Sequence, residues 1–250
     1  MLKIEFHCHT NYLHENETSY NPKQVIDYAA KLGYDILCLS EHYSPICTLE
    51  RFRRNPLQTT EDFKDYAKSK GILLIPSTEY YFPEGEVLLV NIKKKHLQNI
   101  LTIEDLQNLP DSVLRIAPHP FYNMSNCLGK NLFKHKDNID ALEYSFFYNR
   151  FYNKPNIKAE RVSKLLNKPI VGTSDLHDLS WLGYTYTLAD SKKTANSIVK
   201  AVKTNNISVI TRALPLTKYL YTFYFHTLRD PIKFSRKLYS EFILKPSKSP

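Results

Sequence analysis

Short apolar runs alternate with longer amphipathic segments over most of the 250-residue chain. Residues 2–6 alternate apolar and polar side chains, which predicts a strand. Other runs are continuously apolar, which is typical of buried parallel strands. These runs and the other short apolar segments predict strands at 35–40, 72–76, 86–91, 113–117, 139–142, 169–172, 184–188 and 207–210. Helical spacing of apolar residues predicts helices at 22–32, 60–70, 156–166 and 194–203. This alternation predicts an α/β domain with a parallel sheet.

Histidine and carboxylate side chains occur at the end of one predicted strand after another. Period-2 geometry places His7 and His9 on one face of the first strand, and two neighbouring imidazoles form half of a metal site. The other such residues are Glu41, His42, Glu79, His119, Glu143, Asp175 and His177. Each alone is equally well explained as a buried hydrogen-bonded group or a turn residue. Their joint position favours a barrel whose strand ends meet at one metal site.

These motifs, in this order, resemble those of the PHP (polymerase and histidinol phosphatase) family. The resemblance covers residues 1–212 and implies a distorted (β/α)7 barrel, followed by a C-terminal helical basic tail at 213–250. Two positions differ from the usual pattern. The family usually has Asp-His where this chain has Glu41-His42, which leaves the role of Glu41 open. Some members have His where this chain has Glu143, and the carboxylate favours harder ions such as Mn or Fe.

The resemblance implies a metal-dependent phosphoesterase with two or three divalent ions, Zn, Mn or Fe. It assigns a first ion to His7, His9, Glu79 and Asp175, a second to Glu79, His119 and Glu143, and a third to His42 and His177, joined by His14 if its loop folds inward. The metals would activate water for attack on phosphorus. His177 or Asp175 could assist proton transfer. Arg212, at the end of the last predicted strand, is either a bidentate phosphate contact or a surface arginine.

The formal net charge of +9 favours anionic partners such as phosphorylated small molecules, nucleotides or nucleic acid, although a solvated basic surface explains it equally well. From Pro215 the chain changes character. An aromatic block at 219–225 precedes the basic residues Arg229, Lys233, Arg236, Lys237 and Lys245. Either a helix packs its apolar face on the barrel, or a basic surface contacts anionic membrane or nucleic acid.

The chain also lacks several sequence signals. No run of 18 apolar residues indicates a transmembrane helix, and no signal peptide precedes the first strand. The four cysteines form no C-x-x-C pair, and a chain of this size does not need disulfides. We therefore expect reduced thiols and a cytoplasmic protein.

Three classes of function remain to be separated. The first is the phosphoesterase, acting on a phosphomonoester, a nucleotide or a short oligonucleotide. The second is a non-catalytic RNA- or complex-binding subunit on the same barrel, a class that need not keep the metal ligands that this chain has. The third is a metal-dependent amidohydrolase acting on C–N bonds. That class usually has a metal-bridging lysine, and no lysine stands at a comparable predicted strand end here.

Overall fold

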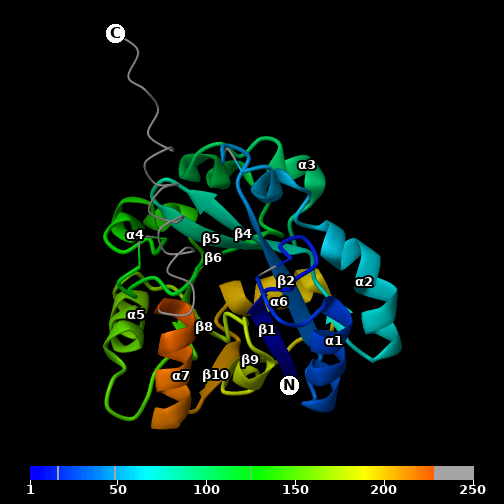
Figure 1. Cartoon of the computed structure of the whole chain (residues 1–250). Coiled ribbons are helices and arrows are strands. Elements are labelled where there is room, and N and C mark those ends of the chain that lie inside the picture. Colours follow the sequence, from blue (N-terminus) through cyan, green and yellow to red (C-terminus); the bar gives the residue numbers. More distant parts are fainter. Residues whose placement is uncertain (16, 48, 125, 228–250) are drawn as a thin grey trace.

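The computed structural model describes residues 1–15, 17–47, 49–124 and 126–227. Within these residues, ten strands form one sheet in the order β10-β9-β1-β2-β4-β5-β6-β7-β8, with β3 paired to β2 (Figure 1). The strands are β1 (Leu2–Cys8), β2 (Ile36–Tyr43), β3 (Leu73–Leu74), β4 (Ser77–Phe82), β5 (Gly85–Val90), β6 (Leu114–Ala117), β7 (Ala141–Ser145), β8 (Ile170–Thr173), β9 (Thr185–Ala189) and β10 (Ile207–Thr211). The helices are α1 (Pro22–Lys31), α2 (Gln58–Ser69), α3 (Lys94–Leu97), α4 (Asn131–Lys134), α5 (Lys154–Leu165), α6 (Ala195–Lys203) and α7 (Leu216–Thr227).

The sheet curls until its far strands meet, which makes a nearly closed barrel. Gly172 of β8 donates its backbone N–H to Thr187 Oγ1 of β9 at 2.9 Å. A Cβ atom at Gly172 would lie 2.8 Å from the Tyr186 carbonyl oxygen, so only glycine permits this approach. The α/β barrel predicted from the sequence is therefore confirmed.

We expect Gly172→Ala to lower the free energy of unfolding by about 1–3 kcal/mol, the usual cost of overpacking. Gly172→Val should cost more, because its added methyl groups meet the same backbone and the Val209 side chain. Urea unfolding of both variants measures the effect. Unchanged midpoints would contradict a steric role for this glycine in barrel closure.

The sheet is mixed, whereas the apolar runs predicted a parallel one. Parallel pairing holds for β1 with β2, β2 with β4, β6 with β7, and β7 with β8. β4 and β5 instead form an antiparallel hairpin, in which Phe82 pairs with Gly85. The connection between them is too short for a crossover helix, so antiparallel pairing follows. β9 also runs antiparallel to both β1 and β10.

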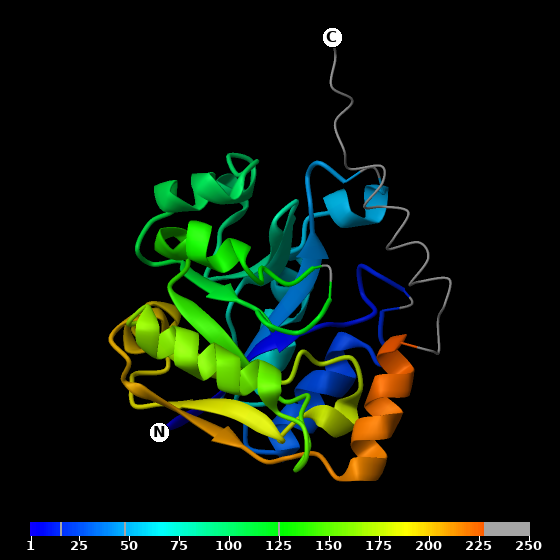
Figure 2. The same ribbon diagram turned by 90° about the vertical axis from the view of Figure 1, so that its left-hand side faces the viewer.

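The predicted helices form on the outside of the barrel. α1 begins with a capping box, in which Asn21 Oδ1 accepts from the Gln24 backbone and Gln24 Oε1 accepts from the Asn21 backbone. α1 and α2 contact each other, and α5 covers β7 and β8 (Figures 1 and 2). The buried residues of α1, which include Val25, Ile26 and Ala29, join the same apolar cluster as Leu37 and Leu39 of β2.

The aromatic block after Pro215 belongs to α7, which packs on the barrel (Figure 2). The Tyr219 ring stacks on Phe147 with centroids 4.7 Å apart, and Lys218 Nζ donates to the Ser180 carbonyl at 2.6 Å. These contacts favour the predicted docking helix. The basic residues from Arg229 to Lys245 lie outside the described residues, so contact with membrane or nucleic acid stays a prediction, as does the domain boundary after residue 212.

Among the described residues, no helix combines the length and the apolar character needed to cross a bilayer.

Candidate metal centre

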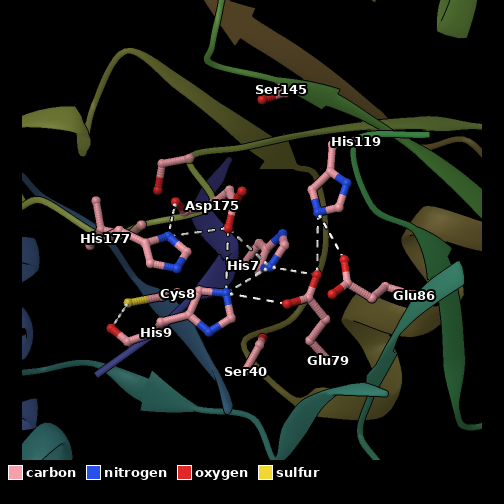
Figure 3. A network of polar contacts seen from close by, with 12 residues as sticks. His7, Cys8, His9, Ser40, Glu79, Glu86, His119, Ser145, Asp175 and His177 are labelled. Carbon is pink, nitrogen blue, oxygen red and sulfur yellow. Dashed lines mark hydrogen bonds and ion pairs between the residues drawn. The ribbon is translucent and has the colours of Figure 1, made fainter. Parts of the chain in front are cut away.

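Histidines and carboxylates from far-apart segments meet at the mouth of the barrel (Figure 3). β1 supplies His7 and leads into His9, and β2 and β4 place His42 directly beside Glu79 in register. Glu143 lies within β7, and the others follow the ends of β6 and β8: His119, Asp175 and His177. Each of these residues contacts another member of this cluster. The strands thus bring together residues separated by up to 170 positions.

The first group of donor atoms surrounds a small volume between β1 and the end of β8. His7 Nε2 and His9 Nε2 lie 3.0 Å apart, and Asp175 Oδ1 lies 3.4 Å from both. Glu79 Oε1 is 3.3 Å from His7 Nε2, and Glu79 Oε2 is 3.5 Å from His9 Nε2. Ligands at ~2.1 Å from a tetrahedral ion lie about 3.4 Å from one another. The separations therefore fit four ligands facing one ion.

Glu79 also faces a second group of donors. Its Oε1 atom lies 3.3 Å from His119 Nε2 as well as from His7 Nε2, so one carboxylate oxygen lies between two imidazoles. Glu79, and not a lysine, is the residue in this bridging position. Glu143 approaches this cluster through His7, because its Oε2 atom is 2.9 Å from His7 Nδ1. An acceptor on the second ring nitrogen fixes the orientation of a ligating histidine.

A third group includes a residue that the sequence analysis missed. Glu17 Oε1 lies 3.0 Å from His177 Nε2 and 3.5 Å from His42 Nε2. His14, the predicted loop ligand, is buried nearby, but its Nε2 lies 3.2 Å from the backbone carbonyl of His42. The two residues are joined by a backbone turn, in which the Glu17 N–H donates to the His14 carbonyl at 2.8 Å. No strand periodicity extends into this loop, so no pattern in the sequence singles out Glu17.

Glu41, whose role the sequence left open, points away from the cluster on the opposite face of β2. Its Oε1 accepts hydrogen bonds from Thr10 and from Thr59, the latter at 3.1 Å. Burial raises the pKa of Glu41 to about 7, although these hydroxyl donors and the charge on His42 oppose the increase. Glu41 therefore anchors the segment after His9 instead of facing the metal centre.

Two cluster residues have left-handed backbone conformations, His119 with φ 31° and Asp175 with φ 41°. Such angles are uncommon outside glycine and concentrate at functional sites. Around Asp175 the backbone is fixed by Leu176, whose N–H donates to the His7 carbonyl at 3.1 Å and whose carbonyl accepts from the His9 N–H at 3.2 Å. The end of β1 and the Asp175 carboxylate are thus held together.

The electrostatics of the cluster suit a divalent cation. Burial, with His42 and His177 close by, lowers the pKa of His9 to about 3, so its imidazole is neutral and keeps a lone pair for a metal. Burial alone would raise the pKa of Asp175 and Glu79, but neighbouring histidines hold both well below the usual range. Glu143 Oε1 is buried with no hydrogen-bond partner in the described residues. Ionised buried carboxylates need compensating positive charge, which protonated neighbouring histidines or a bound cation can supply.

Arg212, the predicted phosphate contact, lies just beyond the end of β10. Its guanidinium carbon is 4.6 Å from the Tyr184 ring centroid, and the side chain is exposed. All four cysteines are buried free thiols. Cys8 points away from the imidazoles, whereas Cys127 Sγ lies 3.3 Å from His119 Nδ1, a contact that the sequence spacing does not reveal.

The fold defines the class of protein to which this chain is similar. It resembles a two-domain protein from Bacteroides vulgatus described as containing a predicted PHP-like metal-dependent phosphoesterase, with a TM-score of 0.66 and 16% identity over 89% of this chain and 69% of that one. It also resembles PsfC from Pseudomonas syringae, with a TM-score of 0.63 and 16% identity over 85% of this chain and 92% of that one. The chain therefore has a PHP-type barrel, as the sequence motifs predicted. No family model matches the sequence, and no curated protein matches it.

Proposed function

We propose that this protein is a metal-dependent phosphoesterase that hydrolyses a phosphomonoester, a nucleotide or a short oligonucleotide. The observation that carries the proposal is the spacing of donor atoms around Glu79. Its two oxygens and Asp175 Oδ1 lie 3.3–3.5 Å from the Nε2 atoms of His7 and His9, as ligands of a shared ion do. His119 Nε2 lies at the same distance from Glu79 Oε1, which supports a second ion bridged by that carboxylate.

The residues are assigned to ions as the resemblance implies, with one addition. The first ion takes His7, His9, Glu79 and Asp175; the second takes Glu79, His119 and Glu143; the third takes His42 and His177 with Glu17 or His14. Zn, Mn and Fe all accept imidazole and carboxylate ligands. Bound ions would supply charge to the phosphate oxygens and lower the pKa of a bound water.

Exposure indicates which side chains meet the substrate. The His7 and His9 side chains are fully buried, whereas Asp175 is 16% and His177 is 13% exposed. His177 Nδ1 lies 3.0 Å from the Asp175 carbonyl oxygen, which selects the tautomer with the proton on Nδ1. His177 Nε2 lies 3.0 Å from Glu17 Oε1, a contact in which the nitrogen donates to the carboxylate and which raises the pKa of His177, although burial opposes the increase. We assign proton transfer to His177 and Asp175, and a phosphate contact to Arg212.

Glu17→Gln is expected to weaken binding of one ion by about 10–100-fold, because the amide keeps the shape but not the charge of the carboxylate. Glu15→Gln, an exposed position on the same loop, is the matched control and should bind as wild type does. Isothermal titration with Mn²⁺ measures both variants and His14→Gln. Equal binding by Glu17→Gln and wild type would remove Glu17 from the site, and loss in His14→Gln alone would restore the ligand that the resemblance implies.

The function is tested on purified full-length protein. Bound metal is measured first, and hydrolysis of a generic phosphoester is then followed with Mn²⁺ and with chelator, before a screen of phosphorylated metabolites and oligonucleotides. Metal-dependent release of phosphate or nucleotide supports the proposal. Metal-free protein that binds RNA tightly without hydrolysis would favour the binding subunit. Activity on amides alone would favour the amidohydrolase.

A further inference from the structure

Cys127 is a buried thiol in contact with a histidine of the metal centre, and the proposed function gives it no role. Its Sγ atom lies 3.3 Å from His119 Nδ1. The other ring nitrogen of His119, Nε2, faces the carboxylates of the cluster, at 3.3 Å from Glu79 Oε1 and 3.5 Å from Glu86 Oε2 (Figure 3). His119 is 3% and Cys127 is 9% exposed, so little bulk water competes for the contact between sulfur and nitrogen.

The same arrangement occurs on the other side of Glu79 Oε1. His7 Nε2 lies 3.3 Å from that oxygen, and His7 Nδ1 lies 2.9 Å from Glu143 Oε2. Each imidazole thus has one nitrogen toward Glu79 and an acceptor behind the other. An acceptor at Nδ1 keeps the proton there, which leaves the Nε2 lone pair for a metal ion and fixes the direction of the ring. Sulfur accepts hydrogen bonds weakly, so Cys127 orients His119 without the charge that Glu143 brings to His7.

The backbone around Cys127 is fixed on two sides. The Gly129 N–H donates to the Pro120 carbonyl at 2.9 Å, which closes the loop that begins directly after His119. At the turn between β4 and β5, Gly85 has φ 141°, and a Cβ atom there would lie 3.0 Å from the Cys127 carbonyl carbon. The turn therefore packs directly against the Cys127 segment. This anchoring keeps the sulfur at one place behind the imidazole, as a residue that orients a ligand requires.

We infer that Cys127 is a positioning residue for the second ion. Its sulfur accepts the Nδ1–H of His119 and thereby directs Nε2 toward the ion beside Glu79. This inference rests on the proposed function and adds to it a residue that does not itself bind the metal. The alternative is that Cys127 only fills space, since a buried cysteine packs as a small apolar residue. The two roles predict opposite orders of metal affinity among variants.

Cys127→Ser keeps a hydrogen-bond acceptor but loses apolar volume, whereas Cys127→Val keeps apolar volume but has no acceptor. Isothermal titration of each full-length variant with Mn²⁺ measures the affinity for each ion, and the EPR spectrum reports coupled Mn²⁺ pairs. A positioning role predicts that Cys127→Val binds the second ion about 10–100-fold more weakly than wild type, and that Cys127→Ser binds it more tightly than Cys127→Val. Affinity for the first ion should be unchanged, because that ion does not use His119.

Cys47→Val is the matched control, because Cys47 is also a free thiol with 9% exposure. It should bind both ions as wild type does. Thermal unfolding in chelator measures the effect of each substitution on packing without metal. A positioning role predicts that the melting temperatures in chelator do not follow the order of the second-ion affinities.

Wild-type affinity for the second ion in Cys127→Val, or tighter binding by Cys127→Val than by Cys127→Ser, would overturn the inference and leave the proposed function intact. Equal weakening of both ions would also overturn it, because a general loss of structure would then be responsible. If Cys127→Val does not fold, Cys127→Ala replaces it, and binding at least as tight as that of Cys127→Ser overturns the inference. A wild-type protein that takes up no ion would overturn the proposed function as well.

Discussion

The Asp175→Asn protein is expected to fold normally and to lose phosphoesterase activity by more than about 100-fold, beyond the effect of removing an outer-shell partner. Asp175 Oδ1 lies 3.4 Å from both His7 Nε2 and His9 Nε2, so this carboxylate oxygen is equidistant from the two imidazoles. An amide has nearly the same shape but no charge to offer a divalent ion. Asparagine also tolerates the left-handed φ of 41° at this position.

Further variants separate the loss of metal binding from the effect of backbone strain on stability. Asp175→Ala should lose activity to the same extent but also lose stability, since alanine in the left-handed region costs about 1–2 kcal/mol. His9→Ala should likewise abolish turnover without unfolding the chain. Asp190→Asn, at an exposed position just after β9, is the control. Steady-state kinetics and thermal unfolding of all four variants provide the measurements. Activity within a few-fold of wild type in Asp175→Asn or His9→Ala would count directly against the ligand set.

Hydrophobic periodicity was enough to predict the barrel and most of the cluster, because both depend on where strands end. His7, His119 and Asp175 follow recognisable apolar runs, and parallel strand ends meet at one mouth. These three residues could therefore be assigned to the cluster without predicting the structure of any loop. The same reasoning predicted helices α1, α2, α5 and α6 to within a few residues.

The residues that the sequence analysis missed depend on contacts that periodicity does not report. Glu17 reaches His42 and His177 through an irregular loop. Glu86 joins the cluster because a tight turn makes β5 return antiparallel to β4, whereas the apolar pattern of β5 fits a parallel strand equally well. Strand direction is set by the length of the connection, and side-chain position within a loop is set by tertiary contacts. Neither follows from the order of apolar and polar residues.

Loading the metal-free protein with Mn²⁺ is expected to raise its melting temperature substantially. The unfolded chain does not hold the donors together, so an ion binds mainly the folded state. At a free ion concentration 100-fold above Kd, each ion stabilises the fold by about 2.7 kcal/mol. For a chain of this size that corresponds to a rise of roughly 5–10 °C for each ion.

The rise in melting temperature, compared between ions and between variants, tests which residues bind the metal. Ca²⁺ prefers all-oxygen sites, so with His7, His9 and His119 in the centre it should raise the melting temperature less than Mn²⁺ does. Asp175→Asn should lose most of the increment from the first ion, whereas Asp190→Asn should keep it. Differential scanning calorimetry with chelator, Mn²⁺ and Ca²⁺ gives these values. Equal stabilisation by Ca²⁺ and Mn²⁺ would indicate carboxylate-only binding and contradict imidazole ligation, because a nitrogen-containing site distinguishes the two ions.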